Sequence, residues 1–158
     1  MKEISLTQGK VALVDDEDYT RVARYHWCFS HGYAKRRATL ALRMSLMIYM
    51  HRLLMGAIQG QEVDHINMNT LDNRRENLRL CTSSQNKGNA KRRTDNTSGF
   101  RGVSFYRRDG NWTAQLVVRG QYLYLGRHAT ATEAARAYDK AARKHFGEFA
   151  RLNFPMGD

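Results

Sequence analysis

The sequence has little proline, little cysteine and no long apolar run, and each shortage excludes a class of protein. Its 158 residues include one proline and two cysteines. Cys28 and Cys81 are too few for a disulfide framework, and no Cys-x-x-Cys pair is present to build a zinc site from thiolates. We therefore expect both cysteines to be reduced and buried.

Long apolar segments are missing as well. The most apolar stretch, residues 40–55, is interrupted by Arg43, His51 and Arg52. It therefore falls short of the ~20 apolar residues that a membrane-spanning helix needs. The first ten residues carry charges and no apolar core, unlike a secretory signal. These features predict a protein that does not enter a membrane.

Acidic residues are outnumbered. Asp and Glu total 15 against 26 Lys and Arg, which gives a net charge of +11 and a pI of about 10.1. Such a surplus attracts polyanions, nucleic acid first and anionic membranes second. Residues 87–99 concentrate four basic side chains against one acidic side chain, and this polar run predicts a linker.

Residues 1–47 have the pattern of an α+β subdomain. The apolar run 11–14 predicts a strand, and the acidic run 15–18 suits the N-terminus of a helix, where the helix dipole favours carboxylates. An apolar spacing of three to four residues continues that helix as far as Trp27. Further strands are expected near residues 27–37 and 42–49. The acidic run is also a candidate metal site, but a helix terminus is the simpler explanation.

The densest set of chemical groups follows this subdomain. Asp64 and His65 are adjacent, and Asn77 and Asn86 follow them. Asp64 and Asn86 offer oxygen atoms to a divalent cation, and His65 can take a proton from water. Metal-assisted phosphodiester cleavage needs these groups. Taken alone, an Asp-His pair is more often a polar turn and Asn77 a cap, but the whole set favours a catalytic interpretation.

This set resembles the signature of the HNH endonucleases, whose ββα-metal site occurs in colicin-type nucleases and in phage or intron homing endonucleases. His65, Asn77 and Asn86 match the three motif positions, and residues 50–54 resemble the His-Arg-Leu segment that precedes the motif in phage members. The resemblance implies a strand, loop, strand and helix, with strands at 61–65 and 78–81 and a helix from about residue 84.

The resemblance also implies roles for individual residues. His65 acts as the general base, Asp64 and Asn86 hold one Mg²⁺ or Mn²⁺, and Asn77 holds the loop and orients His65. His51 either supports the active site or is a packed helix histidine. Arg74 or Arg75 is expected to contact phosphate. Met68 stands where the family loop often has glycine, and a methionine there implies a changed loop conformation or strain.

The C-terminal section alternates apolar and polar residues and then changes to helical spacing. Strands are predicted at 101–106, 112–118 and 122–126, and a helix at 130–146. Segments such as Gly99–Val103 and Glu133–Asp139 resemble the AP2 DNA-binding domain, known from plant transcription factors and from phage and bacterial HNH endonucleases. In that family a three-stranded sheet enters the DNA major groove.

Carried over, the candidate DNA contacts on the sheet are Arg101, Arg107, Trp112, Arg119 and Tyr124. For Trp112, packing and DNA contact are equally favoured interpretations. A single arginine on a strand is more often solvated than bound to DNA. Between two DNA-binding modules, phosphate contact is the favoured interpretation of the basic run with Lys91, Arg92 and Arg93.

The sequence therefore predicts an α+β protein with an HNH ββα-metal nuclease core and a small AP2-like three-stranded antiparallel sheet packed on one helix. The predicted domains are an N-terminal subdomain (1–47), the nuclease core (48–92), a basic linker (93–99) and the AP2-like domain (100–155). The predicted function is metal-dependent cleavage of double-stranded DNA, with a DNA-binding regulator of degenerate nuclease core as the alternative. We expect a monomer without an obligatory protein partner, in the cytoplasm of a bacterium or a phage-infected cell.

Overall fold

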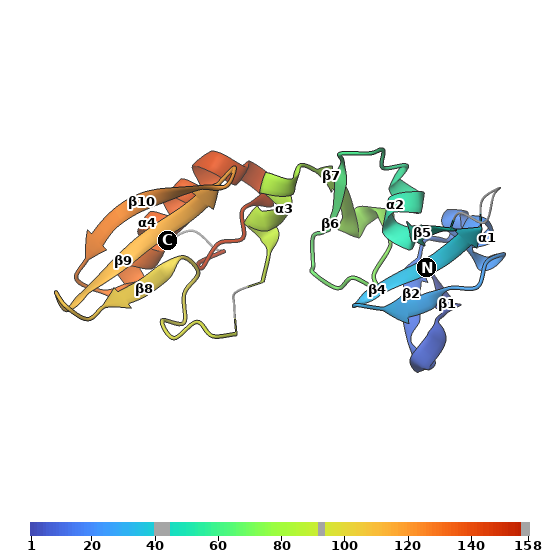
Figure 1. Ribbon diagram of the computed structural model, residues 1–158, viewed down its shortest axis with the longest axis horizontal. Helices are drawn as coiled ribbons and strands as arrows, with labels where there is room; N and C mark the ends of the chain where they lie inside the picture. The colour runs from blue at the N-terminus through green and yellow to red at the C-terminus, as the bar shows by residue number, and fades with distance from the viewer. Residues whose placement is uncertain (40–44, 92–93, 156–158) are drawn as a thin grey trace. The chain divides into compact units, whose positions relative to one another are not determined.

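The computed structural model describes residues 1–39, 45–91 and 94–155 (Figure 1). The chain divides into two compact units, Met1–Thr82 and Ser83–Asp158. Every strand pair among the described residues is antiparallel. The mixed α and β content that the sequence predicts is confirmed.

Within the described residues, the first unit contains three small sheets and two α-helices. The sheet orders are β1-β2, β3-β4-β5 and β6-β7. The elements are β1 (Lys2–Ser5), η1 (Thr7–Gly9), β2 (Val11–Val14), α1 (Asp16–Ala23), β3 (Cys28–Ser30), β4 (Tyr33–Thr39), β5 (Ser45–Tyr49), α2 (Met50–Met55), β6 (Glu62–His65), η3 (Arg75–Asn77) and β7 (Leu78–Cys81). The strands predicted at 11–14 and 78–81 are confirmed. Of the strand predicted at 42–49, residues 42–44 lie outside the described residues and the rest is β5.

The core of the first unit gathers side chains from almost all of its elements. Val14, Val22 and Met50 are fully buried, and Trp27 is also in this core. Trp27 is not on a helix, because α1 ends at Ala23, and the predicted continuation to Trp27 was wrong. The indole Nε1 donates to the Val22 carbonyl at 2.9 Å, which holds the ring against the end of α1.

The second unit is a three-stranded sheet with a long helix packed on it, as predicted for residues 100–155. Its elements are α3 (Ser83–Asn89), β8 (Val103–Tyr106), β9 (Asn111–Val118), β10 (Gln121–His128), α4 (Ala131–Phe146) and η4 (Gly147–Phe149), with the strand order β10-β9-β8. Thr130 and Glu133 form a capping box at the start of α4. Ala134 and Ala135 are fully buried, so the helix lies close to the sheet.

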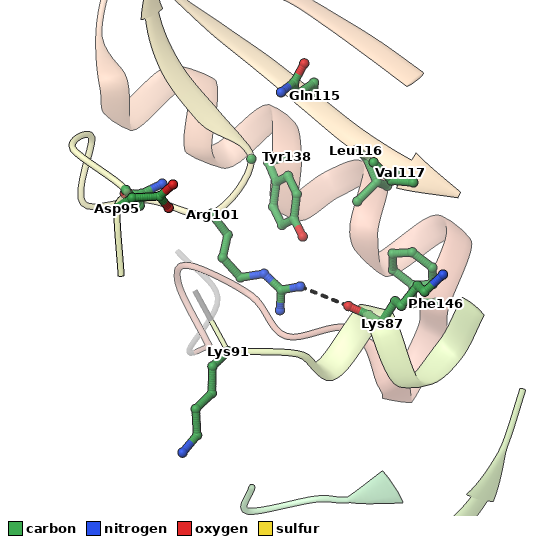
Figure 2. A pocket seen from close by; sticks show the side chains of 11 residues that line it. Lys87, Lys91, Asp95, Arg101, Gln115, Leu116, Val117, Tyr138 and Phe146 are labelled. Carbon is green, nitrogen blue, oxygen red and sulfur yellow. Dashed lines mark hydrogen bonds between the residues drawn. The ribbon is translucent and has the colours of Figure 1, made fainter. Parts of the chain in front are cut away.

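Helix α3 is built into the second unit. It packs on α4 and η4, and a Cβ added to Gly88 would lie 2.9 Å from the Phe146 ring. The Arg101 guanidinium donates to the carbonyls of Gly88 at 2.9 Å and Lys87 at 3.2 Å, and Figure 2 shows Arg101 reaching toward Lys87. The sequence instead predicts this helix as the end of a nuclease core at residues 48–92.

The two cysteines differ in exposure. Both cysteines are free, and Cys81 is buried as predicted, but Cys28 is exposed. Cys28 begins β3, which lies at the edge of its sheet, so that prediction was wrong. No helix within the described residues is long and apolar enough to cross a membrane.

Candidate active site and DNA-binding surface

The β6–β7 hairpin places the Asp-His pair. Asp64 pairs with Arg79 in the strand register, and His65, the last residue of β6, pairs with Leu78. Both acidic and imidazole side chains are buried, each with 5% of its surface exposed. Each of these neighbours on β6 has its own hydrogen-bond contact, Asp64 with Arg79 and His65 with Asn73.

Asp64 is held by an arginine that sequence analysis did not single out. Arg79 donates to Asp64 Oδ2 from Nε at 2.9 Å and from Nη2 at 2.7 Å. The two side chains are 16% and 5% exposed, so this is a buried ion pair. The pair was readable from the hairpin register, because residues directly opposite each other on antiparallel strands have neighbouring Cβ atoms.

Asn77 ties the hairpin loop together. Its side-chain Oδ1 accepts from the Asn67 backbone at 2.9 Å, and its Nδ2 donates to the Asp72 carbonyl at 2.8 Å. Its own carbonyl accepts from the Ile66 backbone at 2.9 Å. These bonds bear out the expectation that the loop is closed by side-chain to backbone contacts.

Met68 keeps the left-handed conformation that glycine would adopt at this position. Its φ is +60°, and its backbone N–H donates to the His65 carbonyl at 2.9 Å. A non-glycine residue in this region costs ~1–2 kcal/mol. The loop therefore accommodates methionine with strain instead of changing its turn.

The His65 imidazole lies in a cluster of rings. The His51 ring is 5.1 Å away in an edge-on arrangement, and Tyr33 is 6.2 Å away. Asn73 Oδ1 lies 3.5 Å from His65 Nε2. Burial lowers the pKa of His65 below its ordinary value, against weaker raising effects of Asn73, Asp64 and Asp72. The imidazole is thus neutral near pH 7, the form that a general base requires.

His51 is also buried and neutral. It is the second residue of α2 and is 7% exposed. Burial first, and then the nearby His65 and Arg52, lower the pKa of His51 to about 3. Its Nδ1 is buried and has no hydrogen-bond partner in the part of the chain that the structure describes. His51 therefore belongs to the surroundings of His65, in agreement with both alternatives that the sequence left open.

The predicted phosphate ligands of the first unit are engaged in ion pairs. Arg74 makes a two-point contact with Asp72 at 2.8 Å and 2.8 Å, and this arginine is the main cause of the lowered pKa of Asp72. Arg75 contacts Asp18 in the same way, at 2.7 Å and 2.8 Å. The acidic run at the start of α1 is thus a partner for Arg75, and the backbone N–H of Arg75 also donates to Asp15.

Asn86 lies on α3 and therefore in the second unit. Its use with Asp64 as a ligand pair stays a prediction. The described part of the chain contains no group of three or more His, Cys, Asp or Glu side chains arranged to hold a metal ion. An aspartate and an asparagine are a different donor set.

In the second unit, one sheet face carries α4 and the other bears exposed aromatic residues. Tyr122 is 78% exposed and Tyr124 61% exposed. Trp112 is half-buried and packs instead against the core of this unit, with its ring 5.0 Å from that of Phe105. Arg107 is exposed, and Arg119 is exposed at a turn with φ +51°. These aromatic and basic groups suit contact with a nucleic acid.

Arg101 and the basic run have different placements. Arg101 is half-buried, binds the end of α3, and lines a cavity of about 360 Å³ with Lys87, Lys91 and Tyr138 (Figure 2). Burial lowers its pKa. Lys91 is exposed, and the predicted contacts Arg92 and Arg93 lie outside the described residues.

Comparison with known proteins agrees with both resemblances. The family model for HNH endonuclease matches residues 49–87, and that for the AP2 domain matches residues 98–148. The uncharacterized HNH endonuclease L560 of Acanthamoeba polyphaga mimivirus is 32% identical over 148 residues, which cover 92% of this chain and 76% of the viral protein.

Plant transcription factors match the second unit alone. AP2-like ethylene-responsive transcription factor TOE2 of Arabidopsis thaliana is 50% identical over 62 residues, which are 39% of this chain. APETALA2-like protein 2 of Oryza sativa subsp. indica is 48% identical over a segment of the same length. The chain spans only 13% and 14% of the lengths of these two factors. The match to the viral protein, in contrast, extends over both units, and this chain belongs to the HNH endonuclease family, as a nuclease that binds DNA and carries an AP2 domain.

Proposed function

We propose that this nuclease hydrolyses phosphodiester bonds of double-stranded DNA with one divalent cation, Mg²⁺ or Mn²⁺, and cuts one strand at each site. The observation that carries the proposal is the buried Asp64–His65 pair on β6, in which burial keeps the imidazole neutral and an arginine holds the carboxylate. A single pair per chain supports a nick, because one hydrolytic site attacks one strand at a time.

The proposed metal ligands are Asp64 and Asn86. Carboxylate and side-chain amide oxygens are hard donors of the kind that Mg²⁺ and Mn²⁺ bind. In the structure Arg79 binds Asp64 Oδ2, so a divalent cation would share this carboxylate with the guanidinium or displace it. The oxygen donors themselves fit a divalent ion, which when bound would supply Lewis-acid polarisation of the phosphate and stabilise the leaving 3′ oxygen.

The residues of the chain would perform the remaining work. His65 would take a proton from the attacking water. Asn77 would keep the loop closed, and with it the end of β6 that carries His65, through its bonds to Asn67 and Asp72. Burial of His65 and Asp64 would limit the water around the reacting groups and so strengthen their electrostatic interactions.

The AP2 sheet would read the DNA. Its side chains are proposed to contact bases in the major groove, from exposed positions at Arg107, Arg119 and Tyr124 and from half-buried positions at Arg101 and Trp112. Phosphate contacts elsewhere would add affinity without sequence information. The proposed sheet contacts are Arg101, Arg107, Trp112, Arg119 and Tyr124, and the proposed phosphate contacts are Arg74, Arg75, Lys91, Arg92 and Arg93. One chain is proposed to act as a monomer, without an obligatory protein partner.

Supercoiled plasmid is the direct test of this function. Wild-type protein with Mg²⁺ or Mn²⁺ should convert it to the nicked circle, and a chelator should stop the reaction. His65→Ala and Asp64→Ala should lower the rate by about 10²–10⁴-fold, the usual contribution of general base catalysis. His26→Ala is the matched control, because His26 is an exposed histidine of the same unit.

Other outcomes would separate the alternatives. If the wild type binds duplex DNA but cuts it no faster than His65→Ala, the DNA-binding regulator with a degenerate core is the better description. A linear product at the earliest times would contradict nicking. Cleavage that survives the chelator would contradict metal dependence.

A further inference from the structure

The contact between His65 and Asn73 bears on which ring nitrogen of the histidine can act. His65 Nε2 lies 3.5 Å from Asn73 Oδ1, and both residues are buried, Asn73 with only 1% of its surface exposed. Sequence analysis did not single out Asn73 as a partner of His65. The loop-closing Asn77, by comparison, makes its bonds to Asn67, Asp72 and Ile66.

Asn73 is held in one orientation. Its backbone N–H donates to the Leu13 carbonyl of β2 at 2.8 Å, and its side-chain Nδ2 donates to the Leu71 carbonyl at 3.2 Å. Since the amide nitrogen is used by Leu71, the amide oxygen is the atom that faces His65. Exchanging the two atoms would bring the oxygen against the Leu71 carbonyl, which only accepts.

The orientation of Asn73 has a consequence for the protons of His65. An amide oxygen accepts but cannot donate, so the contact requires a proton on His65 Nε2. A neutral imidazole with its proton on Nε2 carries its lone pair on Nδ1. The direction of the hydrogen bond therefore distinguishes the two ring nitrogens.

Neighbouring rings restrain rotation of the imidazole. His51 lies edge-on at 5.1 Å, and Tyr33 contacts both histidines, at 5.3 Å from His51 and 6.2 Å from His65. Turning the His65 ring over would lose the Asn73 contact and would have to displace these packed neighbours.

We propose that Asn73 is a positioning residue that fixes His65 as the Nε2–H tautomer, so that Nδ1 is the nitrogen that takes the proton from water. This inference rests on the proposed role of His65 as general base. His51 and Tyr33 assist as a wall that holds the ring in this orientation.

The tautomer can be measured without DNA and without metal. Nitrogen NMR on protein with ¹⁵N-labelled histidine distinguishes a protonated from an unprotonated ring nitrogen, and the His65→Gln spectrum identifies the signals of His65. We expect wild-type His65 to show a proton on Nε2 and a lone pair on Nδ1. A proton on Nδ1 would overturn the proposal.

Kinetics test the consequence for cleavage. Asn73→Leu keeps the size of the side chain but removes the acceptor, and we expect kcat to fall by about 10- to 100-fold, part of the contribution of a general base, with KM for DNA unchanged. Asn73→Asp keeps an acceptor, and both the Nε2–H tautomer and more of kcat should be retained. Asn69→Leu is the control, because Asn69 stabilises the same loop through Leu71 N–H but does not contact His65.

The results separate this inference from the proposed function. Equal losses in Asn69→Leu and Asn73→Leu would assign the effect to loop integrity and would overturn the role of Asn73. A wild-type protein that does not nick plasmid would refute the proposed function, whereas the tautomer of His65 is measured independently of cleavage and of the folding of any Asn73 variant.

Discussion

Asp64 and Arg79 face each other across the β6–β7 hairpin, with Oδ2 and Nη2 2.7 Å apart in a largely buried setting. Two charges in such a setting depend on each other, because removing one leaves the other without compensation. The same carboxylate is a proposed metal ligand. This relationship makes stability in the absence of metal a property that can be tested.

Replacing Arg79 by methionine should destabilise the first unit by about 3 kcal/mol without metal, because the buried Asp64 carboxylate loses its partner. Added Mg²⁺ should recover more stability in this variant than in the wild type, since the cation would then supply positive charge that Arg79 supplies in the wild type. Thermal unfolding with and without Mg²⁺ measures both effects. Arg37→Met is the control, because Arg37 is exposed in the same unit. Equal destabilisation by the two variants would contradict the role given to the ion pair.

His51 should make stability depend on pH between about 3 and 6.5. Its folded pKa of about 3 lies below the ordinary value of 6.5, so the unfolded chain binds more protons in this range. Stability is therefore complete above pH 6.5 and is lost as pH falls, by at most ~1.4 kcal/mol for each pH unit. His65 acts in the same direction.

Urea unfolding of the wild type and of His51→Phe across this range checks the effect. Phenylalanine keeps a ring but cannot be protonated, so the variant should lose less stability on acidification. Parallel pH dependences in the two proteins would show that the acid sensitivity comes from other groups.

Met68→Gly should stabilise the first unit by up to ~1 kcal/mol. The left-handed conformation at φ +60° costs methionine ~1–2 kcal/mol, and the greater chain entropy of glycine in the unfolded state offsets part of the gain. Met68→Ala retains a Cβ and should not be stabilised. Chemical unfolding of the three proteins gives the comparison, and a stabilised alanine variant would rule out backbone strain as the cause.

Gly88→Ala should destabilise the second unit, although alanine is the better helix former by ~1 kcal/mol. The added Cβ would meet the Phe146 ring at 2.9 Å and the Phe149 carbonyl at 3.1 Å. Overpacking of this kind costs ~1–3 kcal/mol, which outweighs the helix gain. Calorimetry is the measurement, with the exposed Lys87→Ala on the same helix as control. A higher melting temperature for Gly88→Ala would show that α3 does not pack here as described.

Arg101 and Arg107 should give different results when each is changed to glutamine. Arg107 is exposed, so its loss should weaken DNA binding and reduce the salt dependence by about one counterion, with unchanged stability. Arg101 donates to the carbonyls at the end of α3, so its loss should lower the melting temperature. Binding titrations at several salt concentrations and thermal melts separate the two effects. Identical behaviour would mean that Arg101 serves mainly as a DNA contact.

Local patterns in the sequence were sufficient to predict much of the secondary structure. The alternation at residues 112–118 predicted β9, because a period of two is a local signal. The Asp-His pair was located on the correct strand through the resemblance to the HNH endonucleases. β1 was not predicted, since residues 2–5 become a strand only by pairing with β2.

Contacts between segments that are distant in the sequence could not be predicted from the sequence. The spacing from Tyr19 to Trp27 fits a helix, yet Trp27 reaches the core from beyond α1. Asn73 meets His65 only once the loop is formed. Arg101 reads as a sheet arginine in the sequence, and its attachment to α3 depends on a segment more than ten residues earlier.

Helix α3 limits where the coding sequence of such a protein can be divided and joined to that of another. It carries Asn86, which lies within the matched HNH segment, yet the surfaces that support it belong to Phe146, Arg101 and the rest of the AP2 unit. A fragment ending at residue 92 would keep the asparagine and lose the scaffold of its helix. Exchange of the AP2 module for another would therefore have to preserve that scaffold, because the second compact unit begins at Ser83 and includes α3.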